Sequence, residues 1–180
     1  MAVTGVEVFR ESFQRAYGLL KSELRDLTAA QMVWRPAPSA NSIAFLAWHT
    51  PRTGDVFFCQ RLMGKPEVWF SQDWTGRIAV AAAGKGLRGL GMGTGFSDEQ
   101  AGDMPLLPPE PYVEYIDAVT AEVDGYLAGL SPDALEQEVH AEGWPDAKLI
   151  AVLFQALNHI HGHRGEIGYI KGLQGIRGRA

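Results

Sequence analysis

Helical spacing of apolar residues over four long segments is the feature that most limits what this chain can fold into. In the first segment, apolar side chains recur every three or four residues from Val6 to Leu27. That period places them on one face of an α-helix. Thr4 and Glu7 have the spacing of a capping box, in which each side chain bonds a free backbone N–H at the helix start. We therefore expect an amphipathic helix beginning at Thr4.

Three further segments show the same period. One follows a cluster of N-cap residues at 39–42 and extends from Ile43 to Phe58. Another follows the proline-rich stretch 108–111 and extends from Tyr112 to Leu130, after which Ser131-Pro132-Asp133 ends it and starts a short helix through Leu135. The last opens near Pro145-Asp146 and runs past Tyr169. Four amphipathic helices with few strand-like segments predict an all-α four-helix bundle. We expect residues 1–180 to form a single domain.

The connection between the second and third predicted helices, from about Gly64 to Pro111, is much longer than a usual interhelical link. It is glycine-rich over 84–95, and we expect it to cross over along the bundle. Gly84–Gly89 matches the spacing of a dinucleotide-binding loop, but the following Leu90–Gly95 cannot open the helix that such a fold requires. Apolar burial should pack the connection down through its large aromatic side chains, namely Trp69, Phe70 and Trp74.

Charge and composition narrow the classes of partner. The net charge of -5 gives no electrostatic footprint for nucleic acid, so we expect no nucleic-acid partner. No apolar run reaches the roughly 20 residues that span a bilayer, and the N-terminus lacks a secretory pattern. The single cysteine, Cys59, cannot form an internal disulfide, which favours a cytoplasmic location. A buried inert thiol is the favoured interpretation of Cys59.

Two histidines in the last predicted helix suggest chemistry. His159 and His163 are four residues apart, so they share one helix face with apolar residues and point toward the core. His49 interrupts the apolar face of the second helix in the same way. Three inward imidazoles predict a divalent metal site with an open fourth position, the arrangement of a catalytic metal. A hydrogen-bonded cluster of core histidines is the alternative, and the spacing alone leaves it open.

Other polar residues near these histidines receive weaker predictions. Glu166 borders the same helix face and is a candidate to orient a ligand imidazole or act as a base, although a solvated carboxylate is equally compatible. His161 should lie outside the ligand set and His140 on the surface. Asp55, nearly opposite His49 on its helix, should be structural. Ile160 stands where a zinc protease of the HExxH type needs its glutamate, which excludes that class.

The two histidine motifs resemble a known family. Asn41–Thr50 is similar to the opening motif of the DinB-like (DinB/YfiT) four-helix-bundle proteins, in which a histidine ends an apolar run. Asn158–Ile167 resembles the second motif of that family, a histidine pair four apart followed by Gly-Glu-Ile. Gly93–Gln100 is similar to a loop found in one branch. The resemblance covers essentially the whole chain. Pro51 departs from it, because a proline within the helix predicts a kink close to His49.

The resemblance implies an up-up-down-down bundle with a long crossover and a zinc or nickel ion held by His49, His159 and His163. Characterised relatives include transferases that use low-molecular-weight thiols such as bacillithiol or mycothiol, and a mycothiol-dependent maleylpyruvate isomerase. We therefore expect a metal-dependent transferase or hydrolase, a small-molecule substrate, a thiol co-substrate and a homodimer. A non-catalytic protein of the stress-response type that binds metal or a small ligand remains the alternative. The pocket mouth is expected to contain three tryptophans, Trp48, Trp69 and Trp74.

Overall fold

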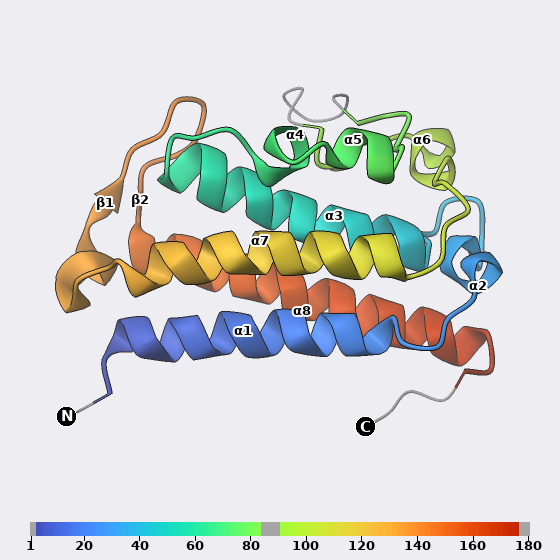
Figure 1. The fold of residues 1–180 in the computed structure, drawn as a ribbon, viewed down its shortest axis with the longest axis horizontal. Helices are drawn as coiled ribbons and strands as arrows, with labels where there is room; N and C mark the ends of the chain where they lie inside the picture. The colour runs from blue at the N-terminus through green and yellow to red at the C-terminus, as the bar shows by residue number, and fades with distance from the viewer. Residues whose placement is uncertain (1–2, 84–90, 177–180) are drawn as a thin grey trace.

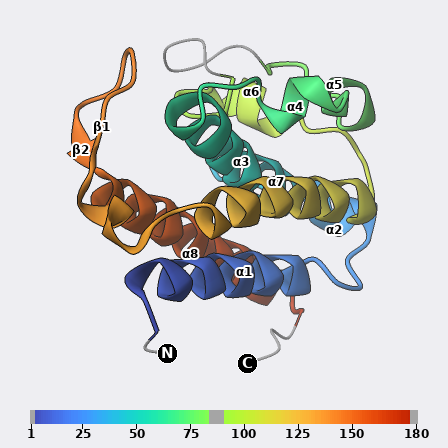
Figure 2. The same ribbon diagram turned by 60° about the vertical axis from the view of Figure 1, so that its left-hand side comes forward.

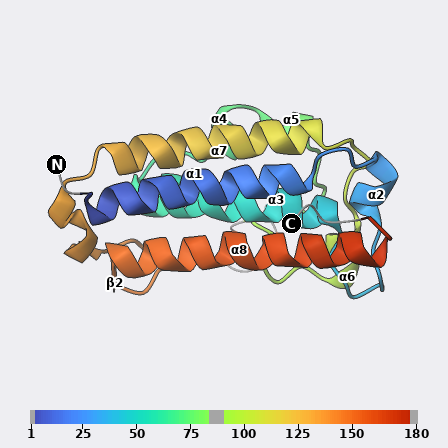
Figure 3. The ribbon, with the colours of Figure 1, turned by 90° about the horizontal axis from the view of Figure 1, so that it is seen from below.

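Four long helices form a bundle in the computed structural model, which describes residues 3–83 and 91–176 (Figure 1). They are α1 (Gly5–Glu23), α3 (Ile43–Asp55), α7 (Glu110–Ala128) and α8 (Leu149–Leu173). Helix α1 packs against α7 and α8, and α3 packs against the same two helices on their other side. Figure 3 shows α1 between α7 and α8, with α3 behind it. The all-α bundle expected from the sequence is confirmed.

The four helices run as two parallel pairs. In Figure 1, α1 and α8 run from left to right and α3 and α7 from right to left. The order along the chain is therefore up, down, down, up, and the up-up-down-down order implied by the resemblance is wrong. The long crossover joins α3 to α7, since two parallel neighbours cannot be linked by a short turn. Within the described residues, no helix is both long and apolar enough to cross a membrane.

Local sequence signals set the helix boundaries. Thr4 and Glu7 make the expected capping box at the start of α1, and the Ser42 hydroxyl accepts the N–H of Phe45 at the start of α3. The short helix after α7 is present as the 3₁₀ turn Pro132–Glu136. A two-stranded antiparallel hairpin follows, which the periodicity did not predict, and it delays the start of α8 to Leu149. The remaining element between α1 and α3 is a short capped helix. The strands of the hairpin are β1 (Glu138–Val139) and β2 (Ala147–Lys148), and the short helix between α1 and α3 is α2 (Ala29–Val33).

Helix α3 continues through Pro51 and passes directly into a π-helical segment, Val56–Leu62. The wider turn is visible where the N–H of Met63 bonds the carbonyl of Phe58, five residues earlier. The predicted second helix therefore exists at its expected place, and His49 lies two residues before the proline on an unbroken helix. π-helical turns are uncommon and often lie at functional sites.

The crossover lies over α3, on the side of the bundle away from α1 (Figures 1 and 2). It contains three short helices, α4 (Val68–Ser71), α5 (Trp74–Arg77) and α6 (Asp98–Gly102). The apolar stretch 78–83 forms no strand, in agreement with the rejection of a dinucleotide fold. The fingerprint-like segment Gly84–Gly89 itself lies outside the described residues.

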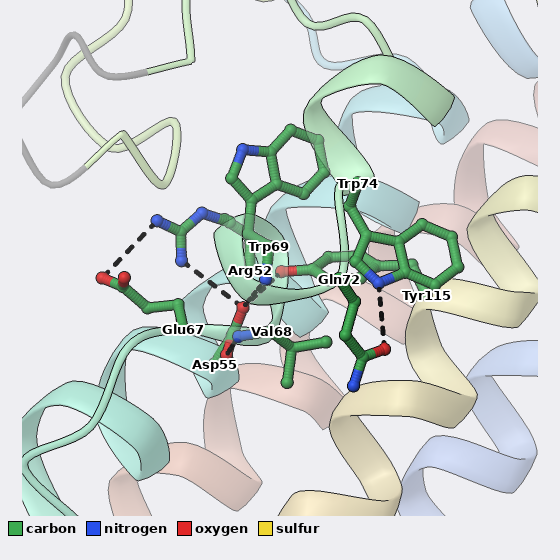
Figure 4. A network of polar contacts seen from close by, with 8 residues as sticks. All are labelled: Arg52, Asp55, Glu67, Val68, Trp69, Gln72, Trp74 and Tyr115. Carbon is green, nitrogen blue, oxygen red and sulfur yellow. Dashed lines mark hydrogen bonds and ion pairs between the residues drawn. The ribbon is translucent and has the colours of Figure 1, made fainter.

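A buried carboxylate fastens the crossover to the bundle (Figure 4). Asp55, at the end of α3, accepts the backbone N–H groups of Val68 and Trp69, each at 2.8 Å. It also accepts the hydroxyl of Tyr115 on α7, at 2.9 Å. Arg52 lies 3.7 Å from the same carboxylate. One side chain thus ties α3, α4 and α7 together, in line with the structural role expected of Asp55.

The tryptophans of this region belong to the core. Trp69 and Trp74 both pack edge-on or tilted against Tyr115, with ring centroids 5.3 Å away, and Trp48 contacts Trp69. All three tryptophans are buried. The expected burial of Phe70 is wrong: it is 55% exposed and lies over the guanidinium of Arg52. A short helix has only one inward face, and in α4 Val68 and Trp69 occupy it.

Candidate metal centre

The three predicted histidines come together between α3 and α8. Nε2 of His159 lies 3.0 Å from Nε2 of His49 and 3.1 Å from Nε2 of His163. One ring nitrogen from each residue lies within 4.8 Å of the other two. Tetrahedral zinc with bonds of about 2.0–2.1 Å to nitrogen requires ligand atoms roughly 3.3 Å apart. The three imidazoles could therefore hold one divalent ion after small adjustments.

The crossover fixes the orientation of the His49 ring. Its Nδ1 bonds the backbone carbonyl of Met92, so Nδ1 carries the proton and Nε2 presents a lone pair to the cluster. Phe45 stacks on the same ring, with centroids 5.4 Å apart and planes inclined by 7°. Metal-ligating histidines usually donate their other N–H to a carbonyl or carboxylate in this way.

The Met92 carbonyl reaches His49 because the next residue is a glycine. Gly93 has φ of +94°, a conformation that residues with a side chain rarely adopt. A Cβ there would also lie 2.9 Å from the Trp48 ring and 3.0 Å from the Phe45 ring. The glycine allows the loop to lie flat on α3, which brings the carbonyl within bonding distance. Neither the orienting carbonyl nor this glycine was assigned a role from the sequence.

The alternative of a purely hydrogen-bonded histidine cluster fits these atoms poorly. A neutral imidazole Nε2 either donates one hydrogen or accepts one, and Nε2 of His159 faces two neighbouring nitrogens. Since the bond to Met92 leaves Nε2 of His49 without a proton, His159 can satisfy one neighbour by donation and not both. A shared cation satisfies all three lone pairs together, so the donor set fits a metal ion better.

The surroundings keep the rings of His49 and His159 neutral, as metal ligands must be. Burial lowers the pKa of His49 to about 4, despite the opposing hydrogen bond to Met92. Burial first, and then the neighbouring rings of His49 and His163, lower the pKa of His159 to about 3. Both lone pairs are therefore available at neutral pH without competition from a proton.

Glu166 lies beside the cluster in the position expected of it. Its Oε1 is 3.2 Å from Nδ1 of His163, which is buried and has no aligned hydrogen-bond partner within the described residues. Its other oxygen is 3.5 Å from the side-chain amide of Asn41. Arg164 and Lys171, basic residues of α8 close to Glu166 in the sequence, pair with Glu23 instead. Glu166 is therefore free to orient the His163 ring.

The histidine cluster borders a cavity of about 490 Å³ between α3 and α8, of the size that binds small molecules. His159 and Met92 contribute to its wall at the cluster, and Arg61 and Trp144 contribute to it as well. The three tryptophans expected at the mouth, Trp48, Trp69 and Trp74, do not line this cavity, so that expectation is wrong. Trp144 from the β1–β2 connection lines it instead, and its place could not be inferred because helix periodicity does not extend to that loop.

The remaining residues of chemical interest lie where the sequence predicted. His161 is exposed on the outer face of α8. His140 is exposed and pairs with Asp146 at 2.9 Å. Cys59 is buried, and burial raises the pKa of its thiol to about 12, so the thiol stays protonated. Among the described residues, only one group of three or more metal-binding side chains gathers, and it contains His49, His159 and His163.

Comparison with known proteins agrees with this geometry. The sequence profile of the DinB superfamily matches residues 12–167, which include all three histidines and Glu166. The chain belongs to the DinB superfamily. None of the curated proteins matches it in sequence. The superfamily assignment confirms the resemblance drawn from the two histidine motifs.

Two solved structures share the fold of this DinB-superfamily chain. A conserved protein from Enterococcus faecalis is similar with a TM-score of 0.82 and 23% identity, over 96% of this chain and 98% of that one. A DinB-like protein from Bacillus cereus ATCC 10987 is similar with a TM-score of 0.62 and 16% identity, over the whole of both chains. At these identities the likeness concerns the fold.

Proposed function

We propose that the protein is a metal-dependent enzyme that uses a zinc or nickel ion bound by His49, His159 and His163. The observation that carries the proposal is the convergence of three imidazole nitrogens beside a cavity large enough for a substrate. When bound, such an ion supplies charge that lowers the pKa of a thiol or a water molecule beside it. Transfer of a low-molecular-weight thiol to a small electrophilic substrate is the favoured reaction.

The protein side chains have separate tasks in this proposal. His49, held by Met92 and Phe45, presents Nε2 in a fixed direction. Glu166 positions His163 and can accept a proton at the edge of the site, as its side chain is half exposed. We propose a small-molecule substrate and a cytoplasmic homodimer, which size-exclusion chromatography with light scattering would check.

An open coordination position favours an enzyme over a structural metal site. Within the described parts of the chain, no fourth His, Cys, Asp or Glu joins the three histidines. Structural zinc sites are usually closed by four protein ligands, whereas catalytic sites keep one position for water or substrate. Hydrolysis by an activated water is the second candidate, supported by the carboxylate of Glu166 next to the ligand set.

Metal analysis of protein purified without an affinity tag tests the site. We expect close to one zinc or nickel ion per chain, and loss of most of it in His159→Ala. His161→Ala, a change on the outer face of the same helix, is the matched control and should keep its metal. Absence of metal from the wild type, or unchanged metal in His159→Ala, would contradict the proposal. Conjugation assays with several thiols and electrophiles then test the transfer reaction, and activity on ester or amide substrates alone would favour the hydrolase.

A further inference from the structure

Three buried polar side chains on the cavity wall have atoms without hydrogen-bond partners in the described part of the chain. They are the hydroxyls of Tyr17 and Thr53 and the Nε of Arg61. The three residues are 0%, 8% and 7% exposed. A buried donor without a partner typically costs about 1–3 kcal/mol. Three such groups on one cavity wall indicate a site whose partners come from a ligand.

Arg61 is the strongest of the three indications, because its charge has no carboxylate beside it. Its Nη2 donates to the carbonyl of Pro145 at 2.9 Å, and its guanidinium lies 4.8 Å from the centre of the Trp144 ring. No described acidic side chain lies within ion-pair distance of it. Arg52, the other buried arginine, has both Asp55 and Glu67 within 4 Å. Burial of an unpaired guanidinium is unfavourable, and an anionic ligand would relieve it.

The backbone places Arg61 and the metal ligands along one stripe. His49, Thr53, Phe57 and Arg61 follow one another at intervals of four residues. Slightly more than three helical turns therefore separate the histidine from the arginine, on the order of 18 Å along the axis at the α-helical rise. Tyr17 of α1 reaches the same cavity, and its hydroxyl occupies the space that a side chain at Gly54 would fill. The cavity thus has a metal-binding wall, hydroxyl donors and a cationic wall.

We propose that Arg61 binds the carboxylate of an elongated substrate or thiol co-substrate whose reacting end lies at the three histidines, with the hydroxyls of Tyr17 and Thr53 on the cavity wall between the two ends. This assignment rests on the proposed function for the location of the reacting end. A carboxylate matches the planar fork of a guanidinium and carries the single charge needed to balance it. The aromatic rings of Phe57 and Trp144, which contact each other and both lie next to Arg61, suit an apolar chain beside the carboxylate.

Titration calorimetry with zinc-loaded protein tests the carboxylate site. The probes are mercaptooctanoate and mercaptoundecanoate, each compared with the alcohol of the same length, mercaptooctanol or mercaptoundecanol. We expect the wild type to bind at least one carboxylate about tenfold or more tightly than its alcohol, the effect of hydrogen bonds to a charged group. Arg61→Met should abolish this preference, whereas Tyr17→Phe, a change further along the cavity, should leave it in place.

Arg77→Met is the matched control, because Arg77 also lies over a tryptophan ring, Trp74, but outside the cavity. It should keep the full preference. Equal affinity of the wild type for acid and alcohol at both lengths would overturn the proposal. So would a preference that survives in Arg61→Met while the variant remains folded by circular dichroism. If Arg61→Met does not fold, an undiminished preference in the milder variant Arg61→Gln, which keeps a polar group but no charge, would count against the site.

A second measurement separates this proposal from the proposed function. Octanoate and octanol are titrated into wild-type protein freed of metal, where only the cavity wall distinguishes them. A preference for octanoate that disappears in Arg61→Met supports the carboxylate site even if no thiol reaches the metal. A thiolate absorption band in cobalt-loaded protein without any carboxylate preference supports the metal chemistry and overturns the carboxylate site.

Discussion

Replacing Asp55 by asparagine should destabilise the protein strongly, although the two side chains have nearly the same shape. The carboxylate receives three hydrogen bonds from buried donors, two from the backbone of α4 and one from Tyr115 (Figure 4). Asparagine has one oxygen, so its amide NH₂ must face at least one of these donors. Its neutral charge also removes the carboxylate that lies 3.7 Å from Arg52, which is 1% exposed, while Glu67 at 3.8 Å stays in place.

The magnitude follows from these two losses. A donor left without an acceptor in the interior costs about 1–3 kcal/mol, and breaking a buried ion pair costs about 3–5 kcal/mol. The costs overlap, and Glu67 at 3.8 Å from Arg52 retains part of the charge balance. We expect a loss of about 3 kcal/mol in the free energy of unfolding, or roughly 6–12 °C in Tm for a chain of this length.

Urea and thermal unfolding of metal-free protein, followed by circular dichroism, would measure this loss without a contribution from metal binding. Asp117→Asn is the matched control, because Asp117 pairs with Lys21 on the surface and is 54% exposed in its side chain. A surface pair contributes at most about 1 kcal/mol. Hydrogen exchange adds a local signal, since the amides of Val68 and Trp69 should lose protection in Asp55→Asn. Equal Tm values for the two variants would refute the reasoning.

Three other predictions concern the site and its surroundings. Gly93→Ala should lower zinc affinity by about tenfold, because the new Cβ displaces the loop and with it the carbonyl that orients His49. Competition with a chelator measures the affinity. Gly125→Ala, where a Cβ meets open space, is the control and should leave the affinity unchanged. Glu166→Gln should lower metal affinity by up to about tenfold, at the low end for residues that orient ligands, and an unchanged affinity would remove Glu166 from the site. Cys59 should react with iodoacetamide far more slowly at pH 8 than an unfolded thiol, because burial raises its pKa to about 12; rapid labelling of the folded protein would contradict this.

The sequence predicted the candidate site best where the residues of that site lie on helices. A period of three or four residues fixes which side chains face inward, and so His49, His159 and His163 could be placed in the core before their distances were known. The same argument separated His161 from the ligand set. Glu166 was found in the same way, as a neighbour on the helix face of His163.

The parts of the site that could not be predicted depend on loop conformation and on how each helix is rotated about its axis. The bond from Met92 to His49 spans 43 residues and depends on a left-handed backbone at Gly93, which no periodicity encodes. Trp48 was expected at the pocket mouth, but it is adjacent to His49, and adjacent residues on a helix point about 100° apart. Arg61 received no role from the sequence. Its importance rests on the lack of a described acidic side chain within ion-pair distance, and only three-dimensional packing shows that.

The contact between Met92 and His49 gives the crossover a thermodynamic connection to the metal. If docking of the loop raises the affinity of the three histidines for an ion, then binding of the ion must favour the docked loop by the same factor. Metal occupancy would therefore protect the segment around Met92 from hydrogen exchange and proteolysis, although this segment offers the ion no side chain. Conversely, a small molecule that displaces the segment around Met92 from His49 would promote metal release. Metal binding and ligand binding can therefore affect each other through the crossover.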